Sequence, residues 1–164
     1  MTASFTNWWI RWEDLKWPGV DAMDRIKYKA DKYVEANIST AVIYGCHFRW
    51  DYMPFFTLLH DYLATVAEQL HQRGIKLFDH HSVNLIHRYD TREEMRHVML
   101  HSGPHIPFCP SREAAKTWEF NGTKLNDWRM VDVKTRDVLF FPQYASEGFC
   151  HRNPAFKEAY QEYA

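Results

Sequence analysis

A single stretch sets the expected architecture: Ile75-Lys76-Leu77-Phe78-Asp79-His80-His81-Ser82. It begins as a short apolar run directly after Gly74, and glycine commonly follows the last turn of a helix. It ends in polar side chains that can titrate or form hydrogen bonds. Residues 39–51, Ser-Thr-Ala-Val-Ile-Tyr-Gly-Cys-His-Phe-Arg-Trp-Asp, repeat this order of apolar run and polar cluster. The repetition indicates a parallel α/β sheet with a site at the carboxyl ends of its strands.

Helical patterns separate the predicted strands. The apolar spacing predicts one helix over 22–36, with Asp21 as its cap, and a second helix from Pro54 to Gly74. A first strand is expected over 7–12. This alternation is typical of a partial (β/α)₈ TIM barrel comprising the first three to four β/α units, since three strands cannot close a barrel.

The region from about 101 to 150 has a different character. Its prolines interrupt regular structure, and Asn-Gly at 121–122 predicts a hairpin over 118–125. A second hairpin is expected over 130–141. Asn153-Pro154 then predicts the start of a last helix. We therefore predict a single domain over 1–164, with an insertion at about 101–150 after the third unit.

Composition narrows the classes of protein. The net charge is −1, so neither a nucleic acid nor a membrane surface is an expected partner. The chain lacks a signal-peptide pattern and an apolar run of the roughly 20 residues that a membrane span needs, which predicts a cytoplasmic location. Cys46, Cys109 and Cys150 are too widely spaced for a disulfide framework or a CxxC zinc site. The aromatic fraction of 16% suits a bulky core or a stacking surface for sugar rings.

Candidate binding residues gather at the ends of the predicted strands. Asp79, His80 and His81 suit charge-assisted hydrogen bonds to sugar hydroxyls or to a carboxylate, and the histidines also suit capping of the strand. Trp50 is either a stacking platform or a core plug, and Arg49 can simply pair with Asp51. The predicted substrate-binding residues are Trp12, His47, Arg49, Trp50, Asp79, His80 and His81.

Glycoside hydrolysis needs a pair of carboxylates. Asp79 and Asp51 are catalytic candidates by residue type, as are Glu13 and Glu147, and no spacing singles out a pair.

A metal site is an alternative use of the histidines. However, the chain contains no HxH or HExxH spacing, and adjacent histidines on a strand point to opposite faces. Neither a metal nor another cofactor is therefore expected. The residues of the alternative metal site would be His47, Asp79, His80, His81 and His87.

Three motifs carry a resemblance to a known family. They are Gly-Cys-His-Phe-Arg-Trp-Asp at 45–51, His-Gln-Arg-Gly-Ile-Lys-Leu at 71–77 and Cys-His-Arg-Asn-Pro-Ala-Phe-Lys-Glu-Ala-Tyr at 150–160. The chain resembles the N-terminal part of the barrel in glycosyl hydrolases that are distantly similar to α-L-fucosidases and β-galactosidase-like proteins. The resemblance implies that His47 binds the sugar. It also implies a nucleophilic aspartate at the end of a fourth strand, which would lie beyond Ala164.

These observations lead to one predicted function and two alternatives. The chain is expected to be a glycoside hydrolase-like barrel portion that contributes sugar-binding residues, with a carbohydrate as its substrate. It would then form a homo-oligomer or be completed by the missing C-terminal half of the barrel. The alternatives are a non-catalytic carbohydrate-binding or structural remnant and a metal-dependent TIM-barrel hydrolase.

Overall fold

The computed structural model describes residues 4–10, 14, 17–19, 21–44, 50–80, 85–87, 91, 93, 117–142 and 146–163. They fall into two compact units. The first holds the described residues up to 44 together with 54–80, and the second holds 50–53 together with those from 85 onward. The single domain with an insertion at about 101–150 stays a prediction.

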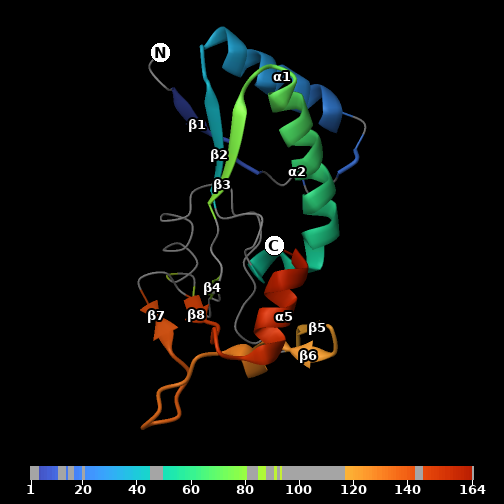
Figure 1. Ribbon diagram of the computed structural model, residues 1–164. Helices are drawn as coiled ribbons and strands as arrows, with labels where there is room; N and C mark the ends of the chain where they lie inside the picture. Colours follow the sequence, from blue (N-terminus) through green and yellow to red (C-terminus); the bar gives the residue numbers. More distant parts are fainter. Residues whose placement is uncertain are drawn as a thin grey trace. The chain divides into compact units, whose positions relative to one another are not determined.

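The first unit is built on a parallel sheet. Strands β1 (Phe5–Asn7), β2 (Thr40–Tyr44) and β3 (Lys76–His80) lie side by side in chain order (Figure 1). The predicted parallel pairing is confirmed, although β1 ends earlier than the strand expected from the sequence. Trp8 still donates its backbone N–H to the Val42 carbonyl at 2.8 Å, so the ladder continues one residue past β1.

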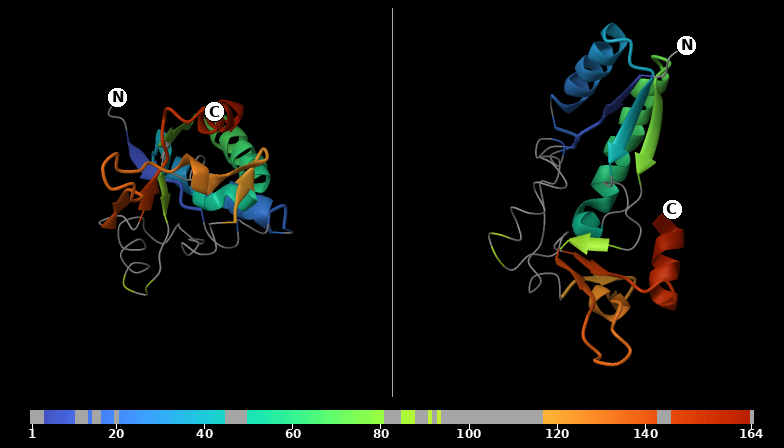
Figure 2. Two further views of the ribbon diagram at one scale, coloured as in Figure 1. Left: turned by 90° about the horizontal axis from the view of Figure 1, so that it is seen from below. Right: turned by 90° about the vertical axis from the view of Figure 1, so that its left-hand side faces the viewer.

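Helices α1 (Ala22–Glu35) and α2 (Phe56–His71) connect these strands and lie on the same side of the sheet (Figure 2). Both crossovers proceed in one direction along the sheet, and right-handed connections of that kind share one face. The observed α1 ends within one residue of its predicted limits. In contrast, α2 begins later than predicted, because Pro54 belongs to a 3₁₀ helix over Trp50–Phe55.

The helix ends use the predicted residues, although one side-chain cap is absent. Asn37 and Gly74 follow the two helices with φ angles of +55° and +72°, the left-handed conformation that ends helices. The Ile75 N–H donates to the Leu70 carbonyl at 3.0 Å and closes the last turn of α2. Asp21 takes the predicted N-cap position of α1, and its carbonyl accepts the Arg25 N–H at 3.0 Å, but its side chain makes no capping bond.

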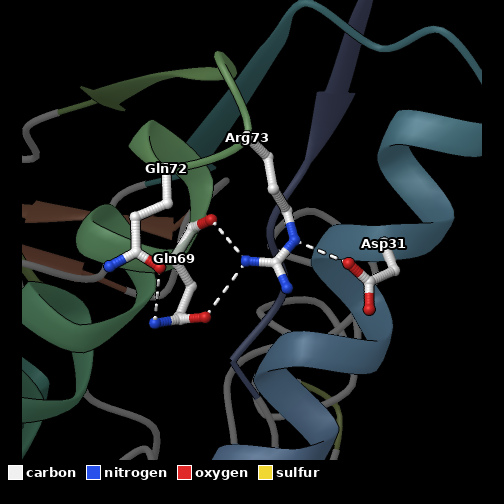
Figure 3. A network of polar contacts seen from close by, with 4 residues as sticks. All are labelled: Asp31, Gln69, Gln72 and Arg73. Atoms are coloured by element: carbon white, nitrogen blue, oxygen red, sulfur yellow. Dashed lines mark hydrogen bonds and ion pairs between the residues drawn. The ribbon is translucent and has the colours of Figure 1, made fainter.

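Polar contacts around Arg73 tie α1 to the end of α2 (Figure 3). The Arg73 Nε donates to Asp31 Oδ1 at 2.6 Å, while Nη1 donates to the Gln69 carbonyl at 2.9 Å and to Gln69 Oε1 at 3.0 Å. The Gln69 amide then donates to Gln72 Oε1 at 3.2 Å. The guanidinium thus joins the two helices at the point where α2 turns into β3.

The two faces of the parallel sheet differ in burial. Ala41 and Ile43 of β2 are buried on one face. On the opposite face, Phe5 is 65% exposed and Phe78 is 55% exposed. These two phenylalanines share that face because their strands place them in register with Thr40 and Val42 of β2. One face of the sheet is therefore packed, and the other presents apolar rings.

The second unit contains an antiparallel sheet in the order β4 (Leu85–His87), β8 (Ser146–Gly148) and β7 (Phe140–Phe141). The hairpin expected over 130–141 is confirmed. Val131 and Val138 form an antiparallel bridge. The Leu139 N–H donates to the Met130 carbonyl and the Asp132 N–H donates to the Asp137 carbonyl, each at 2.9 Å. The second strand of this hairpin continues into β7, which also pairs with β8.

The other predicted hairpin is confirmed. Strands β5 (Glu119–Phe120) and β6 (Thr123–Lys124) pair across Asn121 and Gly122. Both turn residues have positive φ, +48° for Asn121 and +74° for Gly122, as a type I′ turn requires.

Helix α5 (Pro154–Tyr163) and an aromatic core complete the second unit. The predicted cap is confirmed, since Asn153 Oδ1 accepts the Phe156 N–H at 3.1 Å. Trp50 and Trp128 meet edge to face with their ring centroids 5.2 Å apart. The large buried residues of this core are Trp50, Trp128, Phe149 and Phe156.

Candidate functional site

The site predicted at the carboxyl ends of the strands is described only in part. His80 is the last residue of β3, in register with Tyr44 of β2, and Asp51 lies in the 3₁₀ helix. The two strands are neighbours, as the prediction required. The predicted residues that lie outside the described part of the chain are Trp12, His47, Arg49 and His81.

Asp79 lies within β3 and not after it. It is in register with Ile43, on the packed face of the sheet, and its side chain is half-buried. The polar cluster therefore begins inside the strand. Asp79 and Phe78 face opposite sides, because neighbouring residues of a strand alternate.

Trp50 has the surroundings of a core residue. Its side chain is 0% exposed, and its ring packs against Phe120, Trp128 and Phe149 at centroid distances of 5.9, 5.2 and 5.8 Å. A sugar cannot stack on a ring that is already covered. Of the two sequence interpretations of Trp50, the structure favours the core plug and corrects the prediction that it binds substrate.

The structure also describes some of the other catalytic candidates and some of the residues of the alternative metal site. Glu147 is buried on β8, where Arg129 Nη1 lies 3.7 Å from its carboxylate, and Glu13 lies outside the described residues. His87 belongs to β4. Within the described ranges, no three His, Cys, Asp or Glu side chains come together in a way that could hold a metal ion.

A cavity of about 430 Å³ lies in the first unit between α1, α2 and the segment that follows β1. This volume falls within the range of small-molecule sites. Its lining combines aromatic rings with charged side chains. The lining residues are Trp8, Trp9, Asp14, Arg25, Ile26, Tyr28, Lys29, Lys32 and Tyr62.

Side chains joined by a chain of hydrogen bonds line the inner part of the cavity. The Trp8 indole donates to the Tyr62 hydroxyl at 3.0 Å, and that hydroxyl interacts through a hydrogen bond with the Asp14 carboxylate. All three side chains are buried. Burial, and then the nearby Asp14 charge, raise the pKa of Tyr62, so the phenol stays protonated. Trp17 packs edge-on against Tyr62 at 5.8 Å and extends this aromatic floor.

The outer part of the cavity is cationic. The Lys29 ammonium lies 4.1 Å from the centroid of the Trp8 ring, and the Lys32 ammonium lies 5.6 Å from that of Tyr28. Both geometries are those of cation–π interactions. Lys32 also pairs with Glu35 at 2.5 Å. This wall therefore presents cations beside aromatic faces.

The spacing of basic residues in the sequence could have indicated this cavity. Arg25, Lys29 and Lys32 follow one another at i, i+4 and i+7 on α1, which places them on one stripe. The adjacent Trp8 and Trp9 precede that helix. The apolar positions of α1, such as Ile26, predict the helix. They do not show that the basic side chains on its other positions line a cavity.

Comparison of the chain with models of protein families, with curated proteins and with solved structures finds no match. The resemblance to glycosyl hydrolases accordingly stays a prediction. None of the helices in the described ranges combines the length and the apolar character that crossing a membrane requires.

Proposed function

We propose that this chain is the sugar-binding portion of a glycoside hydrolase-like (β/α) barrel, and that the cavity beside α1 holds the sugar. The observation that carries the proposal is the cavity's mixture of aromatic walls and polar groups. Aromatic rings cover the apolar faces of sugars, while polar side chains accept and donate hydrogen bonds to the hydroxyls. Trp9 and Tyr28 are the partly exposed rings of this lining.

Two features of the parallel sheet support the barrel part of the proposal. Strands β1, β2 and β3 follow chain order, as successive strands of a barrel do. Phe5 and Phe78 present apolar rings on the face opposite Ile43. In a closed barrel that face is the packed interior, so apolar residues are expected there.

Binding, and not hydrolysis, is the activity that this cavity supports. Hydrolysis of a glycoside requires two carboxylates. Among the described residues that line the cavity, Asp14 is the one carboxylate, and it takes part in a hydrogen bond with Tyr62. We therefore expect no release of nitrophenol from aryl glycosides by this chain. Turnover that Asp14→Asn abolishes would overturn this expectation.

Calorimetry with a panel of mono- and oligosaccharides tests the binding proposal. Tyr28→Ala should weaken the binding of a sugar about fivefold, because it removes an aromatic contact of about 1 kcal/mol. Phe78→Ala is the matched control, since this ring is similarly exposed but does not line the cavity. A larger loss of sugar affinity with Phe78→Ala would indicate that the sugar binds at the sheet and not in the cavity. Absence of binding to every sugar would refute the proposal.

A further inference from the structure

We infer that Asn121 is a site of spontaneous deamidation, and that its conversion to a carboxylate loosens the contact between the β5–β6 hairpin and α5. The inference concerns the second unit and does not depend on the proposed function. Asn121 and Gly122 form the turn of this hairpin, and both are exposed. Asn121 Nδ2 donates a hydrogen bond to Glu162 Oε2 of α5, so the group that deamidation removes joins the turn to the helix.

Deamidation needs an amide side chain and a backbone nitrogen that can reach it. The Gly122 nitrogen loses its proton and attacks Asn121 Cγ, and a new C–N bond forms while the bond from Cγ to Nδ2 breaks. The Nδ2 group takes up a proton and leaves as ammonia, and a cyclic imide remains. Water then opens the imide at either carbonyl and yields aspartate or isoaspartate, so neither an oxidant nor a reductant takes part.

Gly122 leaves this backbone nitrogen accessible. A Cβ added at Gly122 would meet none of the described atoms within 4 Å, apart from those of its chain neighbours, so the attack is not hindered. In the described part of the chain, no residue accepts a hydrogen bond from the Gly122 N–H. Each strand of the hairpin has two residues, and so short a ribbon opens locally at little cost. The turn can therefore open far enough for the nitrogen to reach Cγ.

The sequence has one asparagine that glycine follows, and it is Asn121. Asn153 precedes Pro154, whose nitrogen carries no proton to lose. Asn37 precedes Ile38, a β-branched residue whose N–H already donates a hydrogen bond to a backbone carbonyl. These two asparagines are therefore internal references against which the rate at Asn121 can be measured.

The product gives Glu162 a second carboxylate in place of a donor. A carboxylate accepts hydrogen bonds and cannot donate them, so the bond between residue 121 and Glu162 is lost. The two negative charges would also repel each other at close range. Glu162 lies in the last turn of α5, where the helix dipole already disfavours negative charge. The last turn of α5 should therefore separate from the hairpin and exchange its amide protons faster.

Incubation of the whole chain in warm, mildly alkaline buffer tests the modification. Peptide mapping by mass spectrometry over a time course measures the conversion of each asparagine, and an assay of free ammonia measures the leaving group. Asn121 should convert severalfold faster than Asn37, and Asn153 should not convert. Equal rates at Asn121 and Asn37 would overturn the inference.

Asn121→Asp tests the consequence separately from the reaction. This variant keeps the hairpin, because Asp-Gly also suits a type I′ turn, so the charge of the turn is what changes. Hydrogen exchange followed by mass spectrometry should be severalfold faster in peptides from 154–163 than in the parent chain. Addition of Glu162→Gln to this variant should restore slow exchange, because the glutamine amide can donate to the introduced carboxylate.

Gln161→Glu is the matched control. It adds the same negative charge to the last turn of α5, at an exposed residue that makes no hydrogen bond to the described residues of the hairpin. Exchange in 154–163 should change less in this variant than in Asn121→Asp. Parent-like exchange in Asn121→Asp, or an equal effect of Gln161→Glu, would overturn the coupling between the turn and α5.

Discussion

Tyr62 is a buried tyrosine whose hydroxyl lies between the Trp8 indole and the Asp14 carboxylate. Because the pKa of Tyr62 is raised, the free energy of unfolding depends on pH in the alkaline range. Below a pH of about 10 the phenol is protonated in both the folded and the unfolded chain. Above that pH the unfolded chain ionises while folded Tyr62 keeps its proton, so each further pH unit removes up to about 1.4 kcal/mol of stability.

Tyr62→Phe tests this pH dependence. The free energy of unfolding in urea should fall less steeply between about pH 10 and about pH 11 in this variant than in the parent chain. At neutral pH the variant should lose about 1–3 kcal/mol, because Trp8 and Asp14 lose a buried partner. Tyr28→Phe is the control, since Tyr28 is 66% exposed. Equal alkaline slopes for parent and Tyr62→Phe would contradict the expected protonation of Tyr62.

At the scale of single residues, the sequence shows which side chains could bind a ligand. It does not show which side chains surround each of them in the fold. Trp50 follows a predicted strand among polar residues, a pattern that a binding residue and a core plug share. Only its contacts with rings such as Trp128 and Phe149, distant in the chain, distinguish the two. Tyr62 fits the apolar spacing of α2. Its hydrogen bonds depend on Trp8 and Asp14, far from it in sequence.

At the scale of elements, α5 depends on Asn153, the residue that precedes it. Asn153 Oδ1 accepts the Phe156 N–H at 3.1 Å, and the Asn153 amide donates to the Asp127 carbonyl at 3.0 Å. Asn153→Ala should lower the free energy of unfolding by about 1 kcal/mol, because it leaves the helix N-terminus without its side-chain acceptor. Urea denaturation monitored by circular dichroism measures the loss.

Asn153→Ser separates the cap from other effects of the substitution. Its hydroxyl can still accept the Phe156 N–H, so it should retain most of the stability that Asn153→Ala loses. If the serine and alanine variants are equally destabilised, the contact with Asp127 and not the cap holds the helix start.

Elements that local chemistry determines could be predicted from the sequence. Gly74, the pair Asn121-Gly122 and the pair Asn153-Pro154 all marked ends or turns that the structure has. Pairing between distant segments could not be predicted in the same way. β4 pairs with β8 although the two strands lie far apart in the chain, because the choice depends on which strands share a sheet and not on local pattern.

At the scale of the whole molecule, the second unit gathers segments from distant parts of the chain. Residues 50–53 precede α2 in sequence, yet they belong with β8 and α5. No local sequence pattern predicts this assembly, because it arises from the mutual burial of aromatic rings. The barrel also remains a proposal at this scale, because a parallel sheet with β1, β2 and β3 in chain order can belong to a barrel or to an open sheet.

Trp50 is expected to hold the second unit together. It is fully buried against Phe120, Trp128 and Phe149, so Trp50→Ala should destabilise this unit by about 3–5 kcal/mol through the cavity it leaves. Hydrogen exchange followed by mass spectrometry should then show faster exchange in peptides from 117–142 and 146–163. Trp50→Phe keeps an aromatic ring and should cause a smaller change. Unchanged exchange in Trp50→Ala would mean that the unit does not depend on this ring, and a selective loss of sugar binding would restore Trp50 to the binding site.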